Sequence, residues 1–405
     1  MMRFTPGSRS MLLVSAMVGA CSNGNTSMSA PSVALATQLA PVIASPARWE
    51  PARTYAVIAG VLSWRDPALP PFSPEERKDQ ELYDVLGARG VPAAQRVLLL
   101  DDAATAPAVL AAITTVAGKA PAGSTLLVYF AGHGTKGADG GIVFATADTN
   151  TKDLASTGLH LDALAPQIMS AFPRGRVLLL ADCCYSGALC AVAGQLAAGG
   201  LEALALTSAD ATNTSTGSWI FTQTLIDALR GDALDDHDAD GAIRVDELVA
   251  EARDAMKHRE GQRFAYVNHG VPAALVLADT APCEGCAPST PTTPFARGAY
   301  VLAPRDGRTV PARVVGASGV TGDDLQVTFY DYSHAVAAVV ARTAVSTAAP
   351  PSYPVGTHLD VTWQGRTWQA DVVKVADGFH FITYPGWPAI WDEWVSADRI
   401  VGLHE

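Results

Sequence analysis

Short apolar runs alternate with helix-like segments along the first two thirds of the chain. The runs at 55–62, 96–100, 126–130, 177–180 and 201–207 are too short for helices and lack the polar alternation of one-sided strands. They therefore predict strands buried on both faces of a parallel sheet. The predicted helices lie between them, near 73–86, 107–116 and 161–169. Strands alternating with helices predict a doubly wound α/β sandwich with a mostly parallel sheet.

The pattern changes after residue 280. A Pro-rich linker at 281–294 is followed by short β runs. We expect a degenerate small β-barrel at 295–348 and a second small all-β module at 349–405. The clearest runs are 299–302, 325–330, 368–375, 379–384 and 391–395.

The N-terminus has the order of a targeting segment. Arg3 and Arg9 precede the apolar stretch 11–18, which is too short to span a membrane as a mature helix. The segment ends in Val-Gly-Ala-Cys21, which resembles a bacterial lipobox. The resemblance implies a signal peptide at 1–20, a lipid on Cys21 and, with Ser22 next, an outer-membrane lipoprotein of the bacterial cell envelope. The alternative is an ordinary signal peptide with an incidental Cys. Residues 21–52 predict a flexible tether.

Composition narrows the classes of partner and cofactor. The chain has 405 residues, 49% of them apolar, and a net charge of −12, so it is long enough for two or three domains with cores. The acidic balance argues against nucleic acid as the main partner. We expect no organic cofactor. Cys283 and Cys286 favour a small disulfide loop over a zinc site, because no second Cys or His pair is nearby.

Two of the predicted strands end in residues that can perform nucleophilic catalysis. His133 follows the run at 126–130, and Cys184 follows the run at 177–180. Reactive groups in open α/β sheets gather just past the carboxyl ends of strands. We therefore expect this imidazole and this thiol to meet, as a nucleophile with its base. The backbone N–H groups of Gly134 and Cys184 are the natural oxyanion donors, and a glycine at 134 would let a substrate approach closely.

These motifs resemble those of the caspase superfamily, within it metacaspases and bacterial caspase-like proteins. The resemblance lies in His133-Gly and in the Asp-x-Cys-x-Ser-Gly pattern around Cys184, and it covers about residues 53–280. In caspases the catalytic His precedes the Cys by a similar interval. The resemblance implies a cysteine endopeptidase domain and selects Cys184 over Cys183, which we expect to point into the core. Tyr185 departs from metacaspases, which usually have His there.

The resemblance also implies a substrate class. Metacaspases cleave peptides or proteins after Arg or Lys, using acidic pocket residues. Asp182 matches the Asp of their Cys motif, and Asp210 is the candidate for their second acid. Two carboxylates would hold a guanidinium bidentately. The alternatives are a capping Asp at 182 and a solvated loop Asp at 210.

A second set of residues predicts calcium binding. Residues 236–247 match the EF-hand loop, with Asp at its first, third and fifth positions, Gly at the sixth and Glu at the twelfth. Helices are predicted on both sides, at 222–230 and 245–256. Arg244 at the ninth position is unusual and suggests lower affinity, and an acidic helix-capping loop is the alternative. The expected ligands are Asp236, Asp238, Asp240, the Ala242 carbonyl and Glu247.

The C-terminal module resembles a Tudor-knot or chromo-barrel domain in its Tyr-x-Gly-Trp and Trp-Asp-Glu-Trp-Val motifs. Its aromatic residues could form a cage for a cation, but we expect most of them to form the barrel's own core. The partner of the module could be either a protein or a small ligand. These residues are Trp363, Trp368, Tyr384, Trp387, Trp391 and Trp394.

The interpretation is therefore a lipid-anchored, caspase-like cysteine endopeptidase that cleaves after basic residues. One rival is a catalytically inactive surface lipoprotein that keeps the fold for protein–protein interaction, since Tyr185 is atypical and an oxidising compartment could cap Cys184. Another is a gingipain-like or legumain-like hydrolase of the same clan, which shares the His-Gly and Cys motifs.

Overall fold

The computed structural model describes residues 47–215, 217–280, 295–318, 323–331, 334–347, 352–363 and 365–404. The predicted signal peptide, Cys21, most of the tether, and the linker with Cys283 and Cys286 lie outside these residues. Among the described residues, none of the helices is long and apolar enough to cross a membrane.

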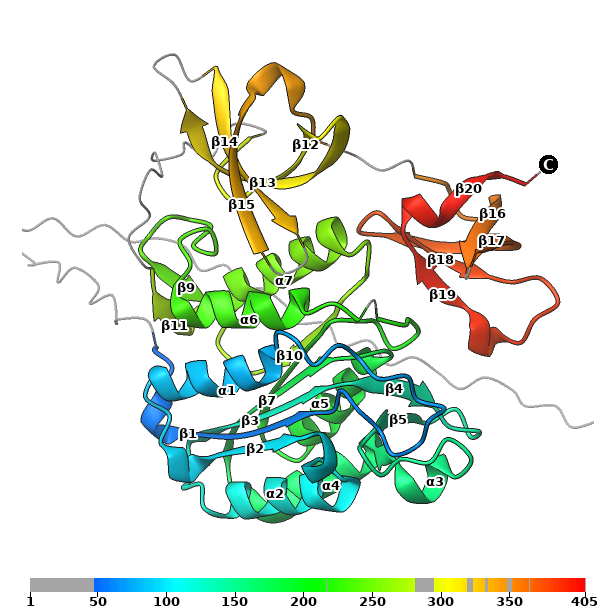
Figure 1. Cartoon of the computed structure of the whole chain (residues 1–405). Coiled ribbons are helices and arrows are strands. Elements are labelled where there is room, and N and C mark those ends of the chain that lie inside the picture. The colour runs from blue at the N-terminus through cyan, green and yellow to red at the C-terminus, as the bar shows by residue number, and fades with distance from the viewer. Residues whose placement is uncertain are drawn as a thin grey trace, which may run out of the picture. The chain divides into compact units, whose positions relative to one another are not determined.

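The centre of the fold is a six-stranded sheet in the order β10-β8-β7-β3-β1-β2 (Figure 1). All neighbours pair in parallel except β10, which is antiparallel to β8. The predicted α/β class with a mostly parallel sheet is confirmed. The strands are β10 (Ala265–His269), β8 (Glu202–Thr207), β7 (Gly175–Asp182), β3 (Ser124–Ala131), β1 (Thr54–Gly60) and β2 (Arg96–Leu100).

Helices cover both faces of this sheet, as expected for a doubly wound sandwich. One core cluster contains apolar side chains of α2 (Ala106–Gly118), α4 (Leu164–Ala171) and α5 (Leu189–Ala198). The other contains those of α1 (Lys78–Ala88), α6 (Ile220–Arg230) and α7 (Val245–Arg259). In Figure 1, α2 and α4 lie on one side of the strands, and α1, α6 and α7 lie on the other. Strands with apolar side chains on both faces fit this double covering.

The first helix begins later than the sequence predicts. The Ser-Pro-Glu-Glu pattern placed its start at 73–76, but α1 begins at Lys78. Glu76 has a φ of 57°, which a right-handed helix does not allow. Directly after it, Arg77 pairs with the buried Asp79 at 2.7 Å and also with Asp101. The ion pair with Asp101, which is distant in sequence, is a tertiary contact that local capping signals do not report.

Smaller elements extend the rim of the sheet. β4 (His133–Lys136), β5 (Ile142–Ala145) and β6 (Leu159–His160) form a three-stranded sheet beside the short helix α3 (Leu154–Thr157). β9 (Ala242–Arg244) pairs antiparallel with β11 (Val276–Asp279) just before α7. His133 therefore does not lie in a free loop but opens a strand of its own.

Two small antiparallel sheets follow, in the segments where β modules were expected. The first has four strands with an apolar core of its own, and the second has five in the order β19-β18-β17-β16-β20. The first consists of β12 (Tyr300–Arg305), β13 (Arg308–Ser318), β14 (Asp324–Asp331) and β15 (His334–Ala341). The second consists of β16 (His358–Trp363), β17 (Arg366–Ala376), β18 (Phe379–Thr383), β19 (Glu393–Val395) and β20 (Ile400–Leu403).

A buried ion cluster links the first of these sheets to the α/β part. Arg313 of β13 is 3% exposed. Its guanidinium lies 3.1 Å from an Asp235 carboxylate oxygen and 2.5 Å from one of Glu251 on α7. Removing one member would leave uncompensated buried charge, which is strongly destabilising. The four-stranded sheet is therefore packed as part of the fold.

Candidate active site

The two strands that carry the candidate nucleophile and base are neighbours. β3 and β7 pair in parallel, and Ala131 stands opposite Asp182 at their carboxyl ends. The Gly132 amide lies 3.4 Å from the Asp182 carbonyl oxygen, which extends the contact past both strands. His133 and Cys184 are therefore released from the same rim of the sheet, as the motif order predicted.

Gly134 is the point of closest approach between the two segments. A Cβ placed there would lie 1.9 Å from the Cys184 carbonyl oxygen and 3.5 Å from the Cys183 sulfur. Real Cβ atoms do not come that close to backbone, so only glycine fits at 134. From the sequence, we expected this glycine to let a substrate approach closely. The structure shows that it first makes room for the backbone at Cys184.

The imidazole of His133 packs against two aromatic rings that also contact each other. Its centroid lies 4.3 Å from that of Trp64 and 4.5 Å from that of Phe72. Its Nε2 lies 2.8 Å from the Pro70 carbonyl oxygen. A carbonyl only accepts hydrogen bonds, so Nε2 carries the proton and Nδ1 of the neutral ring is left as the base.

The surroundings of His133 also keep it ready to accept a proton. Burial lowers its pKa, and the hydrogen bond to Pro70 opposes this in part. The ring is therefore neutral at physiological pH. No sequence motif marks this orienting group, because it is a backbone carbonyl. Proline and aromatic residues at 64–72 marked only a loop, and no motif connects that loop to His133.

The Cys184 thiol is partly exposed and has backbone partners. The Ser215 N–H donates to its sulfur at 3.1 Å. Burial raises the pKa of Cys184, and backbone N–H groups of Ser215, Cys184 and Gly134 oppose that shift. The resting residue is thus a thiol that needs a base. The N–H groups predicted as oxyanion donors are among those aimed at the sulfur.

Cys183 has a different environment, although it is the next residue. Its side chain is 1% exposed and belongs to the core cluster that contains α2, α4 and α5. Burial raises its pKa well above the ordinary thiol value. It is therefore an inert core thiol, in agreement with the expected opposite directions of adjacent side chains.

A pocket of about 500 Å³ lies directly beside Cys184, with Asp182 among its lining residues. The other lining residues include Leu62, Phe72 and Trp219. Asp182 is 8% exposed. An elongated side chain that enters this pocket would thus meet apolar and aromatic side chains, serine residues and one carboxyl group.

Two hydrogen-bond donors of Thr222, on α6, fix the Asp182 carboxylate. Its Oδ2 accepts from the Thr222 hydroxyl at 2.6 Å and from the Thr222 N–H at 3.3 Å. Tyr129 lies 2.7 Å from the same hydroxyl, so the chain of donors continues to β3. Burial raises the pKa of Asp182 to about 6, against the effect of the Thr222 hydrogen bonds. The carboxyl is therefore ionised at neutral pH and titrates just below it.

Asp210, the expected second acid, lies elsewhere. One of its oxygens pairs with the Arg263 guanidinium, and the other accepts from the Thr212 N–H at 3.1 Å. It is absent from the residues that line the pocket of Asp182. Arg263 and Thr212 hold this carboxylate, so the structure brings only one of the two predicted acids to Cys184.

Tyr185, which stands where metacaspases usually have His, takes an unusual backbone conformation. Its φ is 58°, the left-handed region. Its N–H donates to the Asn213 carbonyl at 2.8 Å. The Lys136 ammonium lies 4.9 Å from its ring centroid, a cation–π contact. The side chain is thus held at the rim beside Cys184.

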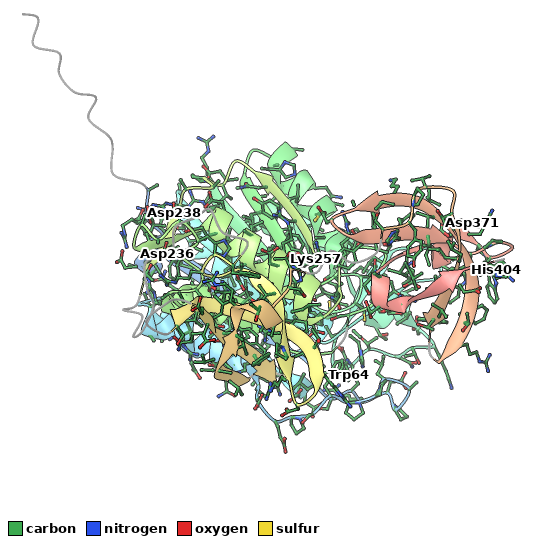
Figure 2. All side chains as sticks on the ribbon, turned by 90° about the horizontal axis from the view of Figure 1, so that it is seen from above. Trp64, Asp236, Asp238, Lys257, Asp371 and His404 are labelled. Carbon is green, nitrogen blue, oxygen red and sulfur yellow. The ribbon has the colours of Figure 1, made fainter. Side chains whose placement is uncertain are left out.

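The predicted calcium loop brings together some of the oxygen atoms that a cation site needs. Oxygens of Asp236, Asp238 and Asp240 lie within 4.8 Å of one another, and Figure 2 labels the first two. However, Arg244 pairs with Asp240 and lies 3.6 Å from Asp238.

Glu247 is also engaged in other contacts. Its carboxylate accepts from the His237 N–H at 2.8 Å and from the Arg244 N–H at 2.9 Å. The three Asp side chains fit a cation, while Arg244 and Glu247 would have to be released to complete the site.

Of the six aromatic residues expected to form most of the core of the C-terminal module, only Tyr384 packs against that core, which corrects the sequence expectation. That core is formed by Leu359, Val361, Ala370, Val372, Ile382 and Val395. Trp387 is 52% exposed, Trp391 49% and Trp363 36%. A sheet this small is filled by aliphatic side chains, so the indoles are left on its surface.

Comparisons with known proteins bear on the fold. No protein-family model matches the chain. No curated protein matches it in sequence. Among solved structures, it is similar to a protein from Geobacter sulfurreducens, with 16% identity, coverage of 56% of this chain and 99% of that one, and a TM-score of 0.40.

Two further similar structures are peptidases. The Drosophila initiator caspase Dronc has 10% identity, coverage of 56% of this chain and 82% of its own, and a TM-score of 0.34. The Arg-specific cysteine proteinase gingipain R has 12% identity, coverage of 73% and 69%, and a TM-score of 0.34. The geometry described above identifies the candidate active site.

Proposed function

We propose that this protein is a cysteine endopeptidase with Cys184 as nucleophile and His133 as base. The observation that carries the proposal is the pairing of β3 and β7, which releases both residues from one rim with Gly134 packed against Cys184. The orientation of His133 by Pro70 supports it, because this hydrogen bond leaves Nδ1 free to accept a proton.

The geometry suggests the order of the chemical steps. In the resting site the Cys184 sulfur lies against the Ser215 backbone, so proton transfer to His133 requires the thiol to rotate when substrate binds. The thiolate attacks the peptide carbonyl, and the N–H groups of Gly134 and Cys184 stabilise the oxyanion. The imidazolium then protonates the leaving amine. Water, deprotonated by the same imidazole, hydrolyses the thioester.

We propose further that the residue before the cleaved bond is Arg or Lys. The pocket beside Cys184 contains the Asp182 carboxylate, and the Leu62, Phe72 and Trp219 side chains in its lining suit the methylene stem of such a side chain. A panel of peptides that differ only in this residue tests the proposal. Preference for aspartyl over arginyl substrates would contradict it.

The ionisation of Asp182 should appear as a pH effect on specificity. With a pKa of about 6, the carboxyl loses its charge as the pH falls through 6, and the attraction for a basic side chain is lost with it. We expect kcat/KM for an arginyl peptide, divided by that for its neutral citrullinyl counterpart, to fall by about tenfold or more between pH 7.5 and 5. Stopped assays over this range measure both values.

The citrullinyl peptide is the control for this experiment, because titration of His133 and Cys184 affects both substrates equally. In the Asp182→Asn variant the ratio should be low at every pH. A ratio that stays constant in the wild type would show that Asp182 does not bind the substrate's charge.

We also propose calcium as a ligand of the loop 236–247, with weak affinity. Arg244 already neutralises part of the acidic cluster and competes with the ion. Calorimetry should therefore detect weak calcium uptake by the wild type and none by Asp240→Ala. Arg244→Gln should bind calcium about tenfold more tightly, which equals about 1.4 kcal/mol. The absence of uptake in all three proteins would remove the proposal.

The rest of the proposed setting comes from the sequence. We propose that lipid on Cys21 anchors the protein to the outer membrane, with a peptide or protein as substrate. A catalytically inactive protein-interaction role is the alternative. Labelling of Cys184 by an arginyl thiol-reactive probe would support the enzyme, and failure to label would favour the alternative.

A further inference from the structure

A second pocket lies next to the candidate active site, where aromatic side chains of the C-terminal module face the rim of the α/β part. It has a volume of about 650 Å³ and is mostly apolar. Its aromatic wall from the module is Trp363, Trp368, Tyr384, Trp387 and Trp391. The α/β part contributes Lys136, Tyr185, Thr212 and Thr214.

Residues that are adjacent in sequence connect this pocket to the pocket of Asp182. Tyr185 lines it and directly follows Cys184, which lines the other. Thr214 lines it and directly precedes Ser215, which also lines the other and donates to the Cys184 sulfur. The two pockets therefore flank the nucleophile, and one extended peptide can reach both.

Specific contacts hold the aromatic wall against the rim. The Asn213 side-chain amide donates to the Trp394 carbonyl, and the Trp394 N–H donates back to Asn213 at 3.2 Å. The Arg263 guanidinium lies 4.2 Å from the Trp394 ring centroid. The same Arg263 pairs with Asp210. Asp210 thus affects the site indirectly, because it pairs with the arginine that contacts the module.

The charges in the pocket favour an uncharged occupant. Its carboxylate, Glu393, receives two guanidinium nitrogens of Arg399 at 2.8 and 2.9 Å and the Tyr384 hydroxyl at 2.7 Å. That carboxylate is already neutralised. Lys136 in the same lining interacts electrostatically with Asp392 and Glu393, so the charges around the pocket largely balance one another and give a cation little advantage. A flat apolar group that covers the exposed indole rings removes apolar surface from water and stabilises the complex.

We propose that this pocket is a substrate subsite that takes a large aromatic side chain of the peptide, a few residues from the cleaved bond. The inference rests on the proposed peptidase function and adds a second determinant of specificity to it. In this arrangement the C-terminal module is a wall of the substrate-binding site. Recognition then needs two features of one substrate, a basic residue at the cleavage point and an aromatic residue nearby.

The test uses the full chain and a set of arginyl peptides. Each peptide carries a single Trp or Ala at one of the three positions on either side of the cleaved bond. We expect one position at which Trp raises kcat/KM by about tenfold to a hundredfold over Ala, through KM. In Trp391→Ala the ratio of kcat/KM for the Trp peptide to that for the Ala peptide should fall close to one.

Val401→Ala is the matched control, because Val401 belongs to the same sheet, is 63% exposed and does not line the pocket. This variant should keep the aromatic preference. Thermal melting of both variants shows whether either substitution has disturbed the module. Unchanged preference for Trp over Ala in a folded Trp391→Ala protein would overturn the proposal. So would a Trp391→Ala protein that cleaves all the peptides faster than the wild type by the same factor, because the module would then only cover the active site.

A binding measurement separates failure of this inference from failure of the proposed function. Calorimetry with Cys184→Ala should show tighter binding of the preferred Trp peptide than of its Ala counterpart, and the difference should vanish in the Cys184→Ala, Trp391→Ala double variant. Binding without any cleavage by the wild type would keep the subsite and reject the peptidase. Equal binding of both peptides, or tighter binding of a trimethyllysine peptide, would reject the aromatic occupant.

Discussion

Replacement of Cys184 by alanine is expected to reduce kcat for an arginyl peptide by about four to six orders of magnitude. The substitution removes the atom that forms the bond to the substrate carbonyl, and the oxyanion donors and binding pockets that stay supply only residual catalysis. A fluorogenic peptide assay under reducing conditions, with calcium added, measures the loss.

Cys183→Ala is the control for this loss. Its sulfur is buried in the core and does not reach solvent, so activity should stay within a few fold of the wild type while stability falls. Loss of activity in Cys183→Ala together with full activity in Cys184→Ala would overturn the assignment of the nucleophile.

Replacement of Gly134 by alanine is expected to lower kcat by about a hundredfold to a thousandfold. The added Cβ would lie 1.9 Å from the Cys184 carbonyl oxygen, so the two rim segments must separate. That movement displaces His133, the Gly134 N–H and the nucleophile relative to one another, and oxyanion donors act only in precise positions.

Gly118→Ala is the matched control for the same chemical change. A Cβ at Gly118, at the end of α2, meets nothing within 4 Å. This variant should keep full activity and equal or slightly higher stability. If Gly134→Ala were fully active at wild-type stability, the tight packing of Gly134 against the Cys184 loop would be contradicted.

The sheet could be predicted from the sequence because its signals are local. Runs such as 126–130 and 177–180 are apolar at consecutive positions, which only strands covered on both faces require. The strand order placed His133 and Cys184 at one rim, and the observed register of β3 against β7 agrees. The predicted start of α1 was wrong because Arg77 forms a tertiary ion pair with Asp101 that no local pattern reports.

Parts of the site could not be predicted, for the same physical reason. Pro70 orients His133 through a backbone carbonyl, a group that every residue has and no motif marks. Asp210 looked available for substrate until Arg263, distant in sequence, was found paired with it. The Trp residues looked like core because aromatic residues usually are, but aliphatic side chains already fill that small sheet.

The sequence by itself determined the class of the fold, the order of its modules and the identity of the candidate nucleophile and base, because burial patterns and short motifs are written along the chain. Only the tertiary structure decided which carboxylate faces the nucleophile, what orients the imidazole and where the indoles point. Those properties depend on atoms far apart in sequence coming within a few ångströms, and contact energies at that range are set by packing rather than by residue type.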